Sequence, residues 1–144
     1  MKINGCYKFR SYYSSRGYLS NVGTYAYNSR SSRLNVWKVV KGVDGTRNSI
    51  TFKNRSNRYG LKVLRNGLAR FYWNAYLTKN KSAFYVTKGL VGRGVSFMPT
   101  GHKGYFLRNK YARRGGKTLL KVEKYNGKSS FKRHATFYAI KSRC

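Results

Sequence analysis

A motif of two short strands separated by a glycine-rich turn recurs along this sequence. Its clearest copy spans residues 94–109, where apolar residues alternate with polar ones on both sides of a turn that contains a proline and two glycines. Similar segments occur twice upstream. The equivalent phenylalanines are Phe9, Phe52 and Phe97, so the copies are 43 and 45 residues apart. A period of this length is typical of repeat architectures.

A second segment with a recurring residue pattern closes each copy. Residues 37–43 match residues 84–90 in their order of aromatic, aliphatic, lysine and glycine positions, and residues 135–140 close the third copy. Three copies of about four strands each predict an all-β fold, a β-trefoil of about twelve short strands. We expect one domain over residues 1–144, with repeats of about 45 residues at approximately 5–45, 46–92 and 93–144.

Local patterns predict further details of the strands and turns. Alternation within the second copy places Ile50 and Phe52 in the core and points Lys53 outward. The Asn66-Gly67 pair between two apolar runs is a strong hairpin signal. The third copy is longer than the others, and its additional residues at 111–117 have the composition of a surface loop.

The charge balance limits the functions that fit this chain. Lysine and arginine contribute 32 residues against two acids, for a formal net charge of +30. So few carboxylates cannot neutralise this charge within the fold, and such an excess positive field typically serves a polyanionic partner. Binding to nucleic acid in vitro is expected from the charge alone. The candidate polyanion-binding residues are Arg108, Lys110, Arg113, Arg114, Lys117, Lys124, Arg58 and Arg70.

The two cysteines, Cys6 and Cys144, lie near opposite ends of the chain. The first and last strands of a trefoil meet, so these residues can lie within disulfide distance, although two unrelated thiols remain an alternative. A bridge would indicate an oxidising compartment and secretion. The first six residues lack the apolar region of a signal peptide, and no apolar run approaches the ~20 residues of a membrane span.

Catalytic and metal-binding constellations are not evident. Asp44 and Glu123 are the only acids, and the repeat pattern places them in unrelated turns of different copies, which argues against a glycosidase carboxylate pair. His102 in a turn and His134 at an expected strand start have no second ligand at a recognised metal spacing. We therefore predict a protein that is not an enzyme and that carries no metal or cofactor.

Three segments of the third copy resemble the AbfB domain, the arabinose-binding module attached to α-L-arabinofuranosidase B. They are Gly-Val-Ser-Phe at 94–97, Gly-Tyr-Phe-Leu-Arg at 104–108 and Phe-Lys-Arg-His-Ala-Thr-Phe at 131–137. The resemblance extends over roughly residues 49–140. It implies a β-trefoil that binds carbohydrate and catalyses nothing.

The resemblance also identifies a vestigial sugar pocket. The family holds arabinose hydroxyls with a histidine and an aspartate, and these positions correspond here to Asn109 and His134, beside Tyr105. In the second copy they correspond to Val63 and Ser82. Carboxylates are strong acceptors for hydroxyl groups, so their loss predicts that the family's mode of arabinofuranose binding is lost.

These observations favour a secreted, non-enzymatic trefoil that binds polyanions, above all acidic or sulfated glycans of the extracellular matrix or cell surface. Binding would release counterions over a broad basic face, with tyrosine and tryptophan rings supplying stacking contacts. One alternative is a structural adhesive or matrix protein that uses its tyrosine- and lysine-rich surface for attachment or cross-linking. A second is antimicrobial action on anionic membranes, although the sequence lacks the amphipathic helix that such action uses. The oligomeric state is left open.

Overall fold

The computed structural model describes residues 1–13, 17–22, 25–29, 35–54, 58–77, 81–114 and 117–144. Twelve strands lie within these residues, together with a short 3₁₀ helix, η1 (Asn74–Tyr76), and one α-helix, α1 (Ser129–His134). The strands are β1 (Cys6–Ser11), β2 (Tyr18–Val22), β3 (Tyr25–Ser29), β4 (Trp37–Lys41), β5 (Ser49–Lys53), β6 (Tyr59–Val63), β7 (Ala69–Trp73), β8 (Phe84–Lys88), β9 (Val95–Pro99), β10 (Tyr105–Arg114), β11 (Lys117–Lys124) and β12 (Phe137–Ser142).

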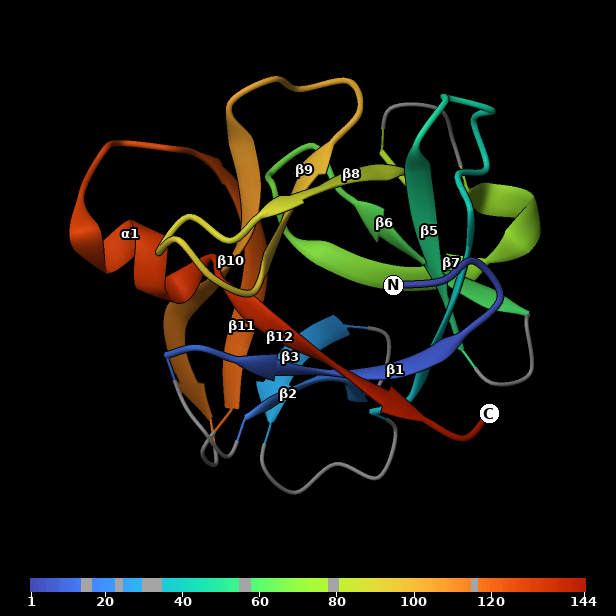
Figure 1. The fold of residues 1–144 in the computed structure, drawn as a ribbon, viewed down its shortest axis with the longest axis horizontal. Coiled ribbons are helices and arrows are strands. Elements are labelled where there is room, and N and C mark those ends of the chain that lie inside the picture. Colours follow the sequence, from blue (N-terminus) through green and yellow to red (C-terminus); the bar gives the residue numbers. More distant parts are fainter. Residues whose placement is uncertain (14–16, 23–24, 30–34, 55–57, 78–80, 115–116) are drawn as a thin grey trace.

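Six of the strands close into a barrel. β1 pairs with β12 and β4, β4 with β5, β5 with β8, β8 with β9, and β9 with β12, so the ring has no open edge. The other six form the hairpins β2–β3, β6–β7 and β10–β11, and β3 pairs with both β7 and β11. A six-stranded barrel capped by three hairpins is a β-trefoil, as predicted (Figure 1).

The three phenylalanines that defined the repeat meet at the centre of the barrel. Phe9, Phe52 and Phe97 are fully buried. Their ring centroids lie 4.9–5.4 Å apart, and each pair of rings meets at close to a right angle. Edge-to-face pairs of this kind add about 0.5–1.5 kcal/mol each beyond the burial of their area. The periodicity in the sequence therefore corresponds to a three-fold aromatic core.

The chain ends are joined beside this core. β1 and β12 pair over six residues, from Cys6 opposite Ser142 to Ser11 opposite Phe137. The Cys6–Cys144 disulfide follows directly from this pairing, with the two Cα atoms 5.3 Å apart. The predicted bridge is confirmed, and it links ends that are 138 residues apart in the sequence.

The expected surface loop at 111–117 is largely wrong. Residues up to Arg114 continue β10, and β11 begins at Lys117, with these two residues paired across the hairpin. β11 also pairs with β3 through Thr118 and Leu119. Polar composition suggested a loop, but neighbouring strands provide hydrogen-bond partners for this backbone, so the hairpin extends.

The helix α1 was not predicted. His134, expected at a strand start, is instead the last residue of this helix. The helix forms because Phe131 is buried in a second, smaller apolar cluster that contains Phe106 and Ala135. This contact fixes α1 against β10. Among the described residues, no helix is long and apolar enough to cross a membrane.

Lys53 does not point outward as predicted. Ile50 and Phe52 are buried as expected, but Lys53 is only 7% exposed, and its Nζ donates a hydrogen bond to Asn74 Oδ1. Every residue of β5 is buried, so both of its faces are covered, and the hydrogen bond to Asn74 places Lys53 against the turn at η1. Burial lowers the pKa of Lys53 below its ordinary value.

Candidate functional site

The β10–β11 hairpin separates apolar and cationic side chains onto opposite faces. Leu107 and Val122 face each other across the hairpin and join the main core. Side chains alternate along a strand, so the next pair, Arg108 and Lys121, lies on the other face. Phe106 on that face packs with the residues of α1. The hairpin thus presents its cations on the side that bears the helix.

Three cations converge on one carboxylate on this face. Glu123 lies 3.0 Å from Lys110 Nζ, 3.7 Å from Arg108 Nη1 and 3.9 Å from Lys121 Nζ. We call Arg108, Lys110, Lys121 and Glu123 the hairpin cluster. Its three cations exceed its single carboxylate by two charges. Because all four side chains are partly exposed, the ion pairs are screened by solvent and the surplus charge remains accessible to a ligand.

Arg108 is the most constrained cation of the hairpin cluster. Its guanidinium lies 4.8 Å above the ring of Phe131, and its Nε donates to the carbonyl oxygen of Asn109 at 3.1 Å. Burial lowers the pKa of Arg108, and the charge of Glu123 acts in the opposite direction. An arginine keeps its charge at physiological pH despite such a shift. Arg108 is therefore a pre-oriented cation beside two lysines whose side chains are more exposed.

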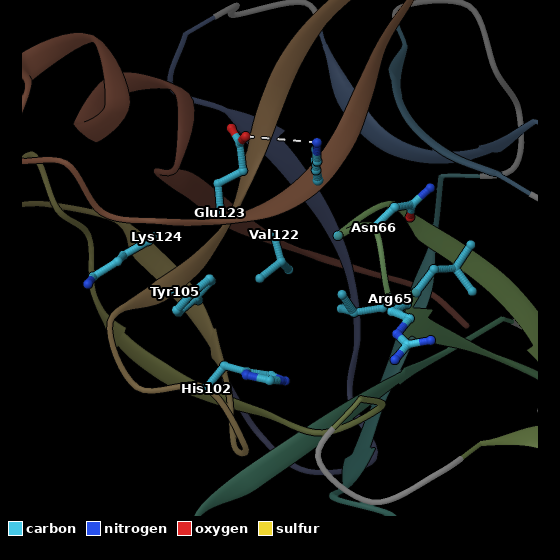
Figure 2. A pocket seen from close by; sticks show the side chains of 11 residues that line it. Arg65, Asn66, His102, Tyr105, Val122, Glu123 and Lys124 are labelled. Carbon is cyan, nitrogen blue, oxygen red and sulfur yellow. Dashed lines mark ion pairs between the residues drawn. The ribbon is translucent and has the colours of Figure 1, made fainter.

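A pocket of about 350 Å³ opens next to the hairpin cluster. In Figure 2, Tyr105 and His102 lie on one side and Arg65 and Asn66 on the other, with Val122 between them, while the dashed ion pair of Glu123 lies at the edge. The pocket is formed by the β6–β7 turn, the β9–β10 turn and β11. Its polar lining residues are Arg65, Asn66, His102, Tyr105, Lys121, Glu123 and Lys124.

The wall of this pocket depends on the predicted Asn66-Gly67 hairpin turn. Gly67 has a φ of +86°, which favours glycine. Its carbonyl accepts a hydrogen bond of 2.7 Å from the backbone N–H of Val122, and a Cβ at this position would lie 2.6 Å from the Val122 oxygen. The turn can therefore dock on β11 only with glycine at position 67. This contact holds the β6–β7 and β10–β11 hairpins together.

The predicted polyanion-binding residues fall into two groups. Six lie on the β10–β11 hairpin, where Arg108 and Lys110 join the hairpin cluster and Lys124 lines the pocket. The other two lie in the second repeat, Arg58 before β6 and Arg70 in β7. The remaining members of the first group are Arg113, Arg114 and Lys117, whose backbone lies in the hairpin and whose side chains fall outside the described part of the structure.

The β6–β7 hairpin holds cations next to an aromatic ring. Lys62 and Arg70 are paired across the hairpin. The Lys62 Nζ lies 5.2 Å and the Arg70 guanidinium 5.6 Å from the centre of the Tyr72 ring. The negative face of the ring offsets part of the repulsion between two adjacent cations. Arg58 is exposed at the far end of β6.

The vestigial sugar-pocket residues occupy different surroundings. Tyr105 lines the pocket, with its ring 5.7 Å from His102. Asn109, four residues or about 13 Å further along the strand, is fully buried and donates to Ser11 Oγ at 2.7 Å. His134 stacks on Tyr13 at 4.2 Å. The structure therefore places Tyr105 and Asn109 apart and uses Asn109 in an internal contact between β10 and β1.

His134 lies in a cationic environment. Burial lowers its pKa below the ordinary value, and the charges of Arg108 and Arg133 lower it further. The Nδ1 atom is buried without a hydrogen-bond partner among the described residues. Both effects favour the neutral imidazole over its charged form.

Both acids have structural partners. Asp44 accepts hydrogen bonds from the Thr46 backbone N–H at 2.9 Å and the Thr100 hydroxyl at 2.8 Å. Glu123 is held by the cations of the hairpin cluster; it lies within β11, so its predicted placement in a turn is wrong. The repeat pattern suggested a turn, whereas alternation along residues 119–124 would have shown Glu123 and the overlooked Lys121 on one strand face. No group of three metal-ligating side chains occurs among the described residues.

Comparison with known proteins finds likeness in structure and not in sequence. No family model matches the chain, and a search of curated proteins finds no match. The cytolethal distending toxin of Haemophilus ducreyi matches with a TM-score of 0.73 at 14% identity, over 94% of this chain and 83% of the toxin chain. The designed three-fold symmetric protein ThreeFoil matches with a TM-score of 0.65 at 16% identity, over 94% of this chain and 98% of its own.

An arabinofuranosidase provides a further match. An arabinofuranosidase in complex with arabinofuranosyl-alpha-1,2-xylobiose gives a TM-score of 0.80 at 14% identity, over 97% of this chain and 31% of the enzyme chain. This chain thus spans about a third of the enzyme's length. At such identities the likeness establishes the β-trefoil fold, which is the fold that the AbfB resemblance implied.

Proposed function

We propose that residues 1–144 act as a secreted, non-enzymatic β-trefoil domain that binds acidic or sulfated glycans of an extracellular matrix or cell surface. The observation that carries the proposal is the hairpin cluster, where three cations surround one carboxylate in a chain with a net charge of +30. Sulfate or carboxylate groups of a ligand would neutralise the two surplus charges.

The binding mechanism follows from this surplus. A polyanion carries condensed counterions, and cations of the protein replace them, so binding weakens as salt concentration rises. Arg108 offers a fixed planar donor for an anionic group, while Lys110 and Lys121 act as adjustable point charges. Because many cations share the contact, each single substitution weakens binding by a small step. Nucleic acid competes in vitro through the same electrostatics.

The carbohydrate part of the proposal has separate support. The matched arabinofuranosidase is in complex with an arabinofuranosyl-containing sugar, and the AbfB resemblance implies a carbohydrate-binding module. In this chain both carboxylates are already engaged by Thr46, Thr100 and the hairpin cations. Few strong acceptors remain for neutral sugar hydroxyls, so anionic sugars suit this surface better than arabinan.

Secretion is inferred from the disulfide. Bridges persist in oxidising compartments and are rare in the cytosol. The Cys6–Cys144 bridge links the two ends of the fold. Because an extracellular setting is oxidising, it would preserve this bridge.

The experiment measures binding to heparin, a neutral arabinan and duplex DNA at low and high salt. Lys110→Ala and Lys121→Ala should weaken heparin binding by similar small factors. Lys41→Ala is the matched control, since it removes one exposed charge at the end of β4, outside the hairpin cluster. An equal loss in the control would remove the hairpin cluster from the proposal, and abolition by one hairpin variant would indicate a defined pocket in place of a broad face.

An adhesive or matrix role is the second candidate, because several tyrosines are accessible. Tyr76 is 62% exposed, Tyr13 47% and Tyr105 37%. Mass spectrometry of the native protein tests this role: hydroxylated tyrosines would favour it, and unmodified tyrosines would leave both roles open.

A further inference from the structure

Two large aromatic side chains lie exposed at the end of the β6–β7 hairpin. Trp73 is 51% exposed and Tyr76 is 62% exposed, and Tyr59 packs against Trp73 with ring centroids 4.3 Å apart at an angle of 38°. We call Tyr59 and Trp73 the aromatic platform; Tyr76 lies three residues after Trp73, in η1. Tyr59 is partly buried and packs against the main core. In Figure 1 the turn η1, in yellow-green, lies at the edge of the molecule opposite α1.

The backbone of the aromatic platform is fixed before any ligand binds. Tyr59 and Trp73 are opposite each other in the β6–β7 register. The Asn74 N–H donates to the carbonyl of Arg58 at 2.9 Å, and the Leu77 N–H closes η1 onto Asn74. A rigid aromatic surface loses little conformational freedom on binding, which favours affinity.

Leu77, the residue after η1, is anchored by a close contact with β6. Leu77 lies against Gly60, where a Cβ would approach Leu77 Cδ1 to 2.6 Å. Gly60 is buried, so its missing side chain provides the space that Leu77 fills. This packing keeps η1 folded over the end of the hairpin and leaves the rings of Trp73 and Tyr76 facing solvent.

Cationic side chains lie around the end of this hairpin, and the β6–β7 register places Lys62 on the face opposite Tyr59 and Trp73. Lys62 Nζ donates to the carbonyl oxygen of Tyr76 at 3.0 Å, Lys53 donates to Asn74, and Arg58 is exposed beside β6. The protein's two acids lie elsewhere, in the β4–β5 turn and in β11. The charged groups of this surface are therefore donors, which complements a ligand that combines a flat apolar face with anionic groups.

We propose that the aromatic platform binds a single pyranose ring of a sulfated or carboxylated glycan. The apolar face of the ring would stack on Trp73, and Arg58, which precedes Tyr59 at the start of β6, would bind its anionic substituents. The inference rests on the proposed function and deepens it, since it adds a second, stacking site to the hairpin cluster. Contact by stacking is less sensitive to salt than contact by charge, so the two sites can be told apart.

Tryptophan fluorescence offers a direct test. The chain has two tryptophans; Trp37 is 1% exposed, with its Nε1–H donating to the Leu19 carbonyl, so ligand-induced changes in emission come mainly from Trp73. A heparin-derived tetrasaccharide is titrated at 0.15 M and 0.5 M NaCl. We expect a saturable change in emission at both salt concentrations, with a weaker affinity at the higher one.

Substitutions separate stacking from charge. Trp73→Ala should weaken tetrasaccharide binding, followed by calorimetry, by about tenfold, the scale of one lost aromatic stacking partner. Trp73→Phe should retain most of the affinity. The matched control Ile3→Ala removes an exposed apolar side chain of similar exposure, 49%, away from the aromatic platform and should leave binding unchanged. Circular dichroism and thermal unfolding verify that each variant is folded.

The outcomes distinguish the two proposals. Tetrasaccharide binding that leaves the emission unchanged and survives Trp73→Ala would overturn the aromatic platform and leave the hairpin cluster intact. Absence of binding to any sulfated glycan would overturn both proposals. If an oligothymidylate produced the same emission change at lower concentration, the site would belong to single-stranded nucleic acid and the glycan assignment would be wrong.

Discussion

Breaking the Cys6–Cys144 bridge should remove a large share of the folding stability. The bridge closes a loop with a sequence separation of 138 residues. For a loop of this length, the chain-entropy model gives a stabilisation of about 5 kcal/mol at 25 °C. Domains have net stabilities of about 5–15 kcal/mol. A chain with a net charge of +30 also pays for compaction through self-repulsion, so we expect the reduced protein to be only marginally stable at low salt.

Two variants separate the cross-link from local packing. Cys144 is exposed, so Cys144→Ala breaks the bridge and leaves the buried Cys6 side chain in place. The double variant Cys6→Ala/Cys144→Ala adds a small cavity in β1. If the bridge acts through the unfolded chain, the single variant alone should lose most of the stability, and its urea m-value should rise because its unfolded state is more expanded.

Urea is the appropriate denaturant because it is uncharged and does not screen the lysines and arginines. Unfolding is followed by circular dichroism and Trp37 fluorescence, for the oxidised protein and both variants, at two salt concentrations. A loss below about 1 kcal/mol, with an unchanged m-value, would refute the reasoning. It would mean that the paired strands β1 and β12 keep the ends together even when the rest of the chain is unfolded.

Two further predictions concern the core and the histidine beside the hairpin cluster. Phe52→Ala should destabilise the fold by about 3–5 kcal/mol in urea unfolding, since it opens a cavity among Phe9, Phe52 and Phe97. The control Val43→Ala, at an exposed position, should change the free energy of unfolding by less than about 0.5 kcal/mol. Equal effects of the two substitutions would contradict the proposed core. Because the native pKa of His134 is lowered by burial and by Arg108 and Arg133, stability should be full above the ordinary pKa of about 6.5 and fall as pH decreases from there toward the native pKa. His134→Gln should flatten this part of the pH profile, and an unchanged slope would exclude His134 as its source.

The repeat in the sequence was sufficient to predict the trefoil. Phe9, Phe52 and Phe97 recur at a nearly constant period because the barrel is three-fold and each repeat must fill the same central position. The position of the disulfide followed from the same symmetry, since closing the barrel brings the first and last strands together. These features depend on spacing, which a sequence displays directly.

The errors lie where tertiary contacts overrode local pattern. Lys53 alternates as an exposed residue would, but it is buried against the η1 turn, where it is bonded to Asn74. Residues 111–117 have the composition of a loop, but residues up to Arg114 continue β10, and Arg114 pairs with Lys117 of β11. The helix α1 depends on a pocket for Phe131 that no local signal describes.

The candidate site was predictable in its charge and not in its geometry. The sequence indicated that Arg108 and Lys110 belong to a cationic surface, but the role of Lys121 depends on the register of β10 against β11. The exposure of Trp73 depends on η1, and only the β6–β7 pairing and the contact of Leu77 with Gly60 determine where that turn lies.

The most direct test of the central claim compares binding to heparin and to a neutral arabinan over a range of salt concentrations. The account predicts strong heparin binding that falls steeply as salt rises, smaller losses of affinity for each hairpin variant, and no arabinan binding. Arabinan binding that resists salt would contradict it, because it would show that a neutral-sugar pocket functions here without free carboxylates and that the positive charge is not the basis of recognition.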